Sequence, residues 1–153
     1  MIDLGKIDTV KGSNEGFDVE LYHPGTNADL GIVITVLGKD SDEFQKITRQ
    51  QNKKRMDRMS KNGFRSGKVA PPSQDELDSD NLDVLSGCTT GWKTLEVTDK
   101  DGEVVESEKD TITLAGDEVA FSCYTAKILY SRFPWIKEQI DIAIGDRANF
   151  IKA

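Results

Sequence analysis

The sequence contains little of what catalytic and metal sites are built from. It has a single histidine, His23, and two cysteines, Cys88 and Cys123. One histidine cannot supply a two-histidine metal site, and no cysteine or aspartate pair accompanies His23 at ligand spacing. Neither a G-x-x-x-x-G-K-[ST] phosphate loop nor a G-x-G-x-x-G motif occurs. We therefore expect no metal, no cofactor and no enzymatic activity.

The sequence also lacks the segments that direct export or membrane insertion. Its first residues do not form the charged, apolar and small-residue zones of a signal peptide. The longest apolar run, Ile32 to Leu37, is far shorter than the roughly 18 residues of a membrane span and suits a buried strand. We therefore expect a soluble, intracellular protein with no membrane partner. In that compartment Cys88 and Cys123 are predicted to be reduced, buried thiols.

Positive charge is scarce overall but concentrated in one segment. The net charge of −7 argues against general binding to nucleic acid. Residues 46–68, however, contain nine basic residues and one acidic residue, whereas five acidic residues follow between positions 75 and 83. The basic segment includes Lys53, Lys54 and Arg55 as candidates for contact with a partner. The alternative, which we favour, is that the two segments neutralise each other within one molecule.

The first part of the chain predicts two strands followed by a helix. Residues 1–16 have the composition of a loose leader. Alternating apolar residues predict a strand from Phe17 to Leu21, and β-branched residues predict a second from Ile32 to Leu37, together an antiparallel pair. A helix capped by Asp40 is expected from about Ser41 to Met59. Its apolar positions are sparse, so it should lie on the outside.

The second part predicts helices around a small β structure. Ser73, after two prolines, should cap a helix that ends at Gly87. A strand is expected at 92–98, a turn at 99–102 and further β structure at 104–105 and 111–114. A helix capped by Asp117 should run to about Arg132, followed by a helix at 134–145 that begins with Pro134 and a last helical turn at 147–151. In the helix at 134–145, Ile136, Ile140 and Ile144 recur every four residues and predict one apolar stripe.

These elements predict an α+β fold. The N-terminal antiparallel pair and the basic helix occupy residues 1–59, and residues 60–72, rich in small residues and prolines, form a predicted flexible linker. A mainly helical C-terminal region with a β insert occupies residues 73–153. The two parts are either separate domains or one composite domain.

Four aromatic residues in the C-terminal half have two interpretations. Trp92, Phe133, Trp135 and Phe150 are the type of residue that fills a hydrophobic core. Aromatic residues also anchor many protein–protein interfaces. We interpret core packing as the commoner role and keep all four as candidate partner-binding residues.

Short motifs in a fixed order run through residues 91–151. They are Trp92, the turn at Asp101-Gly102, Phe133-Pro134-Trp135, Gln139-Ile140-Asp141 and Arg147-Ala148-Asn149-Phe150. In this respect the chain resembles the tail assembly chaperones of bacteriophages with long, non-contractile tails. The stretch from Glu103 to Leu114 is longer than that family leads us to expect, and the first 90 residues carry no part of the resemblance.

The resemblance implies a function for the chain. Such chaperones coat the tape measure protein, a long helical chain, until tube subunits replace them. By this resemblance we expect binding to a phage tape measure protein, self-association, a location in the cytoplasm of the infected bacterium, and absence from the mature virion. A charged exterior with sparse apolar stripes is compatible with that role.

The sequence leaves two other functions open. A structural virion component, such as a tail tube or head–tail joining protein, could add its N-terminal β pair to a neighbour's sheet. A nucleic-acid-binding regulator could use the basic segment at residues 46–68, and its binding would depend steeply on salt.

Overall fold

The structure, a computed structural model, describes residues 1–66 and 73–151. Helices and antiparallel strands are both abundant, which confirms the α+β class. The elements are η1 Leu4–Ile7, α1 Thr9–Glu15, β1 Phe17–Tyr22, β2 Asp29–Val36, α2 Asp42–Ser66, α3 Gln74–Gly87, β3 Thr89–Lys100, β4 Glu103–Lys109, β5 Thr111–Leu114, β6 Asp117–Ala120, α4 Cys123–Arg132, α5 Pro134–Gly145 and η2 Arg147–Phe150.

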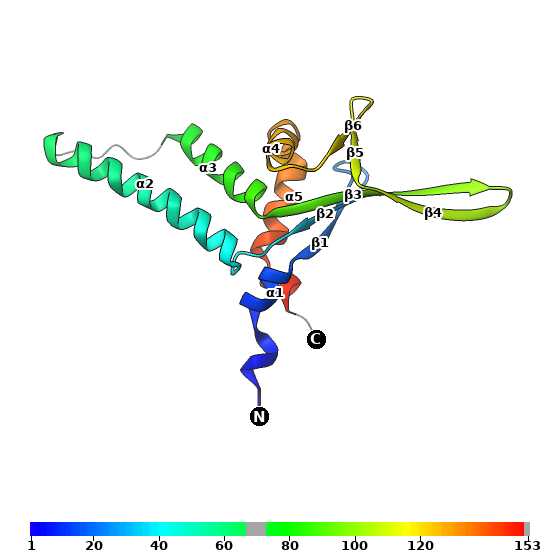
Figure 1. The fold of residues 1–153 in the computed structure, drawn as a ribbon, viewed down its shortest axis with the longest axis horizontal. Coiled ribbons are helices and arrows are strands. Elements are labelled where there is room, and N and C mark those ends of the chain that lie inside the picture. Colours follow the sequence, from blue (N-terminus) through cyan, green and yellow to red (C-terminus); the bar gives the residue numbers. More distant parts are fainter. Residues whose placement is uncertain (67–72, 152–153) are drawn as a thin grey trace.

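One sheet organises the fold. Its strands lie in the order β1-β2-β3-β4, and β5 and β6 form a separate hairpin. In Figure 1, α2 and α3 project to the left as a helical arm, while β3 and β4 extend to the right. Pairing of β2 with β3 ends at Ile32 and Thr94, so β3 pairs with β4 alone from Leu95 onward. We call residues 95–109 the β arm and the remaining sheet, with α4, α5 and η2, the body.

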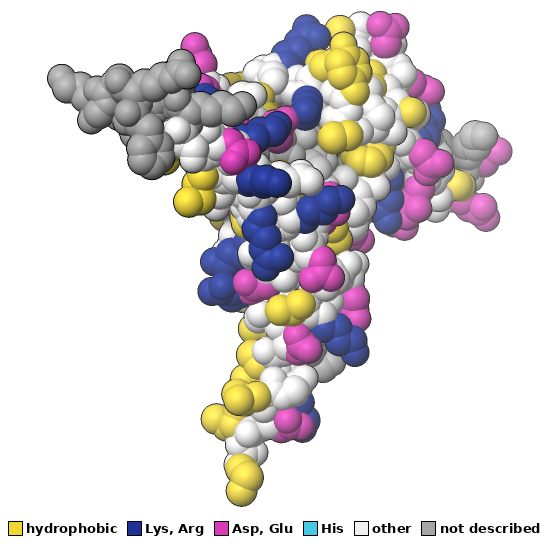
Figure 2. Space-filling model, turned by 60° about the vertical axis from the view of Figure 1, so that its left-hand side comes forward, with side chains coloured by type: hydrophobic (Ala, Val, Ile, Leu, Met, Phe, Trp, Pro, Cys, Tyr) yellow, Lys and Arg dark blue, Asp and Glu magenta, His cyan; other side chains and the backbone are white. Residues whose placement is uncertain are grey.

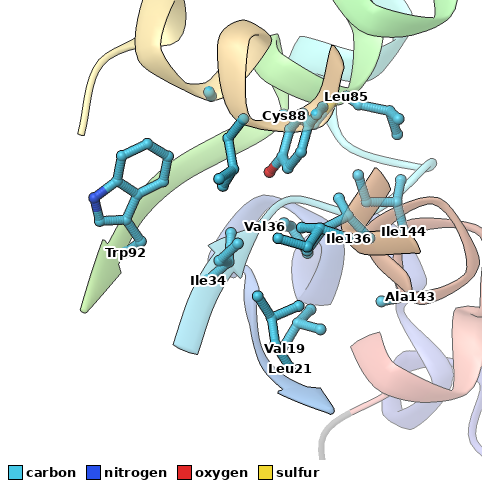
Figure 3. Close-up of a cluster of buried hydrophobic side chains, with 14 of the residues drawn as sticks. Val19, Leu21, Ile34, Val36, Leu85, Cys88, Trp92, Ile136, Ala143 and Ile144 are labelled. Carbon is cyan, nitrogen blue, oxygen red and sulfur yellow. The ribbon is translucent and has the colours of Figure 1, made fainter. Parts of the chain in front are cut away.

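The core lies between one face of the sheet and the helices, because alternate residues of each strand point to the same side. Figure 3 shows residues of β1 and β2 facing α5 and the end of α3. The core includes Val19, Leu21, Ile34, Val36, Leu85, Cys88, Leu129, Tyr130, Ile136, Ile140, Ile144 and Phe150. The predicted stripe along α5, with a spacing of four residues, is therefore confirmed as a buried face.

Several predicted boundaries are confirmed by local contacts. The β1–β2 pair is antiparallel, with Phe17 opposite Val36. The hydroxyl of Ser73 accepts a hydrogen bond from the amide of Glu76 and so caps α3. Pro134 occupies the first turn of α5. Asp101 and Gly102 both have positive φ, as a tight turn between β3 and β4 requires.

The structure corrects the predictions for the N-terminal part. Residues 1–16 are not a loose leader, because η1 and α1 form there and the backbone of Gly12 lies against that of Phe150. The helix predicted to end at Met59 continues to Ser66, so the predicted linker cannot begin at residue 60. The rest of that linker, 67–72, lies outside the described residues. The N-cap of α2 is Ser41 rather than Asp40, since the Ser41 hydroxyl accepts from the amide of Phe44.

A second correction concerns residues 115–120. Asp117 was predicted to cap a helix but begins β6, which pairs with β5 across the turn at Ala115 and Gly116. Both turn residues have positive φ, the conformation of a two-residue hairpin. The helix begins instead at Cys123, where Ser122 and Thr125 form a reciprocal capping box.

The predicted division at residues 60–72 does not separate two sheets. Strand β2 from the first part pairs with β3 from the second, and Val33 lies opposite Lys93. Helix α5 also packs on β1. Within the described residues the strands of both parts thus share one sheet, as expected for a composite domain.

Candidate protein-interaction site

An apolar cleft lies where β3, the β5–β6 hairpin and α4 meet. Its volume is about 120 Å³, and it is lined by Trp92, Ile112, Leu114, Val119, Thr125, Ile128 and Leu129. All but one of these described residues are apolar, and none is charged. An engineered apolar cavity of about 150 Å³ holds benzene in another protein. The cleft is somewhat smaller than that cavity, and its volume suits one aliphatic side chain.

Local interactions hold the walls of the cleft in place. The hydroxyl of Thr94 donates a hydrogen bond of 2.6 Å to the carbonyl of Thr111, which fixes β5 against β3. On the other side, the hydroxyl of Thr125 donates to the carbonyl of Ala120 at 3.0 Å, joining α4 to β6. The hairpin and the helix are thus connected to each other and to the sheet around the cleft.

Trp92 forms a fixed wall of the cleft. Its indole nitrogen donates to the carbonyl of Val119 at 3.2 Å, and Phe121 packs against the ring edge to face at 5.3 Å. The residue is only 7% exposed. In Figure 3 its ring lies at the margin of the core cluster. Because the indole N–H is already satisfied, Trp92 offers a partner apolar contact but no hydrogen bond.

The rim of the cleft carries exposed apolar side chains on α4. Ile128 is 38% exposed and Tyr124 is 73% exposed. The two are four residues apart and so lie on one face of the helix, whereas Ala126, Leu129 and Tyr130 occupy the buried face. A cleft that leads onto an exposed apolar rim suits a partner that presents more than one apolar residue.

Sequence reasoning found Trp92 but missed the rest of this site. One feature of the sequence does indicate it: α4 has more apolar residues than one buried face requires. Ala126, Leu129 and Tyr130 fill that face, so Tyr124 and Ile128 are left over. The other wall could not be found from pattern, because residues 117–120 were interpreted as the start of a helix.

The other predicted aromatic residues lie away from the cleft. Phe133 and Trp135 are half-buried at the α4–α5 junction, packed edge to face at 6.2 Å, and the guanidinium of Arg132 lies 5.7 Å from the Phe133 ring centre. Phe150 is buried in the core and contacts Phe17. Trp92 and Phe150 thus follow the core-packing interpretation, although one side of Trp92 also faces the cleft.

The basic segment and the acidic cluster meet in the helical arm, as the favoured interpretation predicted. Arg55 pairs with Asp80, and Arg58 makes two hydrogen bonds to Glu76 that hold the pKa of Glu76 below its ordinary value. The pairing is partial, since Lys53 and Lys54 are exposed and form no ion pair within the described residues.

The motifs that suggested a family have structural roles. The side-chain amide of Gln139 donates to the carbonyl of Tyr22 and accepts from its amide, at 2.9 and 3.0 Å. Arg147 binds the Asp40 carboxylate through two nitrogens, at 2.7 and 3.0 Å, which lowers the pKa of Asp40. Asn149 donates to the carbonyl of Ala143 and so closes the end of α5. These residues fasten the C-terminal elements to the sheet and to the start of α2.

The two cysteines and the single histidine lie in different parts of the fold. Both cysteines are free, as predicted, but only Cys88 is buried, and burial raises the pKa of its thiol to about 12. Cys123 is exposed at the start of α4, contrary to the prediction. His23 lies in the β1–β2 turn, where its Nδ1 accepts from the amides of Gly25 and Thr26. The described residues contain no cluster of three potential metal ligands, and none of their helices could cross a bilayer.

Comparison of the chain with protein-family models, with curated proteins and with solved structures finds no match.

Proposed function

We propose that this protein is a phage tail assembly chaperone that binds the tape measure protein and keeps it soluble during tail assembly. It acts by reversible binding, without catalysis, in the cytoplasm of the infected bacterium, and it leaves before the virion is complete. The proposal combines the ordered C-terminal motifs with one structural observation, the apolar cleft beside Trp92.

The cleft supports the proposal through its size and its chemistry. A long helix presents apolar side chains one turn apart, and a cleft of about 120 Å³ takes one of them while Tyr124 and Ile128 cover the next. Because the site is small and uncharged, binding depends on apolar contact and stays reversible. The charged surface elsewhere keeps the complex soluble.

Co-expression with the candidate tape measure protein tests the proposal. The wild-type chain should yield a soluble complex that co-purifies, and Ile128→Glu should abolish it, because a carboxylate at the rim cannot be desolvated against an apolar partner. The matched control is Ile142→Glu, which places the same charge at a 65% exposed isoleucine of α5. A tape measure protein that stays insoluble with the wild-type chain, or equal binding by both variants, contradicts the proposal.

A structural virion component is the second candidate, favoured by the open edge of the sheet. Gln139 occupies the β1 edge at Tyr22, so addition of a strand there is hindered. The outer edge of β4 has no partner strand in the described structure. A neighbour's strand could therefore add to β4. Detection of the protein in purified virions would favour this function over the chaperone.

A further inference from the structure

Helix α2 and the β arm carry opposite net charges. Helix α2 contains eight basic and three acidic residues, whereas the segment from Glu96 to Asp110 contains seven acidic residues and two lysines. Arg55 and Arg58 are already paired with α3, so much of the remaining positive charge lies on the outward face of α2. The β arm has no comparable cationic neighbour beyond Lys93 and Lys109 within the described residues.

The outward face of α2 combines cations with an apolar side chain. Lys46, Arg49, Lys53 and Met56 recur at helical spacing and are all exposed. Met56 is 68% exposed, and the three cations form no ion pair within the described residues. Figure 2 brings this side of the molecule forward and shows Lys and Arg side chains gathered over it. The opposite side of the helix carries Phe44, Ile47 and Gln51, which are partly buried.

One face of the β arm has the complementary composition. In the β3–β4 register, Val97 lies opposite Glu106 and Asp99 lies opposite Val104, so these four side chains share one face. The two valines are 67% and 68% exposed. Neither Glu106 nor Asp99 forms an ion pair within the described residues. The face therefore presents apolar contacts flanked by carboxylates.

These two faces cannot meet within one molecule, because α2 and the β arm project from opposite sides of the body (Figure 1). We propose that the β arm of one copy docks on the outward face of α2 of a second copy. Val97 and Val104 then contact Met56, while Glu106 and Asp99 approach Lys53 and Arg49. The occupant is a second copy because both halves of the contact, matched in charge and apolar content, belong to this chain.

The contact is head-to-tail, since each copy contributes a different surface to each of its two neighbours. Such an interface closes into a ring or continues as an open helical chain, depending on the rotation between copies. Its attraction comes largely from exposed charges, so association is expected to be weak and sensitive to salt. The resemblance implies self-association but not the surfaces that meet. The inference names these surfaces from the charge and exposure of α2 and the β arm, and it is tested on the isolated chain.

Sedimentation velocity of the isolated chain tests the proposal. At about 0.05 M salt the weight-average sedimentation coefficient should rise with protein concentration, and at about 0.5 M salt the rise should largely disappear as screening shortens the range of the charges. A wild-type chain that sediments as a monomer at every concentration and ionic strength overturns the proposal. Self-association that is unaffected by salt overturns it as well.

Charge-reversal variants identify the two surfaces. Lys53→Glu and Glu106→Lys should each weaken self-association by about tenfold or more, since like charges would face each other. An equimolar mixture of the two, and the double variant Lys53→Glu/Glu106→Lys, should regain it. Lys11→Glu on α1 and Glu138→Lys on α5 are the matched controls, because both residues are exposed and lie on other elements.

The variants that lose self-association distinguish this contact from other modes of association. If Glu106→Lys weakens association and Lys53→Glu does not, the β arms pair with each other and the proposal fails. Failure of the mixture to recover association also overturns it. All four substituted residues are exposed, so far-ultraviolet circular dichroism should show an unchanged fold in every variant.

Discussion

The body and the two arms differ in what their side chains contact. In the body, the motif residues Gln139, Arg147 and Phe150 join segments that are more than 100 positions apart in the sequence. In the arms, all of β4 is exposed, and no described side chain of α2 is fully buried. The body therefore holds the fold, whereas α2 and the β arm expose charged and apolar side chains.

Two arginine–carboxylate pairs make the comparison concrete. Arg147 reaches Asp40 across 107 positions, from η2 to the start of α2. Arg58 reaches Glu76 across 18 positions and stays within the helical arm. Both pairs use two nitrogens, but only the first joins the C-terminal segment to the rest of the fold. Position in the fold, rather than geometry of the pair, should decide how much each contributes to stability.

The largest expected effect comes from Phe150 in the core. Phe150→Ala removes a ring that is 1% exposed and should lower the free energy of unfolding by about 3–5 kcal/mol. Ile142→Ala is the control, because Ile142 is 65% exposed and its loss should change stability by less than about 0.5 kcal/mol. Urea denaturation measures both. Equal midpoints for the two variants would show that Phe150 does not anchor the body.

A smaller loss of stability is expected when the hydrogen bonds at the β1 edge of the sheet are removed. Gln139→Ala removes both hydrogen bonds to the Tyr22 backbone and should cost about 1–2 kcal/mol. Exchange of the Tyr22 amide hydrogen should accelerate in the variant, because that amide loses its acceptor. Gln139→Glu is the matched control, since it keeps the acceptor for the amide and loses only the donor. An unchanged exchange rate at Tyr22 in Gln139→Ala would contradict the assignment.

Much of the fold was predictable from sequence because its signals are local. Alternation predicted β1, the serine before Gln74 and the proline at 134 predicted helix starts, and the spacing of Ile136, Ile140 and Ile144 predicted the buried face of α5. In each case the residues that carry the signal also make the contact. The same holds for Asp101 and Gly102, which adopt the positive φ that their turn requires.

What was missed depends on contacts between distant segments. Asp117 followed by Glu118 fits a helix start as well as a strand, and only the pairing of Ile112 with Val119 decides between them. The apolar cleft requires three elements to meet at Trp92, and no spacing in the sequence reveals such a meeting. The partner of Asp40 was missed for the same reason, since Arg147 lies 107 positions away.

The Arg147–Asp40 pair should give a pH-dependent effect smaller than that of Gln139. Arg147→Gln should lower stability at neutral pH, because the wild-type pair holds the folded-state pKa of Asp40 below its ordinary 3.8. A depressed carboxyl pKa stabilises above the unfolded value and loses that stabilisation as pH falls through the folded value. The difference from wild type should therefore be constant near neutral pH and shrink below about pH 4. Thermal unfolding across this range measures it, and a difference that does not change with pH would point to packing instead.

The smallest change in stability is expected from an arginine-to-glutamine substitution in the helical arm, at Arg58. Arg58→Gln should leave the midpoint of global unfolding unchanged within error, because the Arg58–Glu76 pair is exposed and joins only α2 to α3. The pKa of Glu76, now depressed by Arg58, should rise toward its ordinary 4.5. Amide exchange should accelerate in α2 and α3 and stay unchanged in β1 and α5, since the arm opens independently of the body. Unaltered exchange in α2 and α3, or a shifted global midpoint, would mean that the helical arm and the body unfold as one unit.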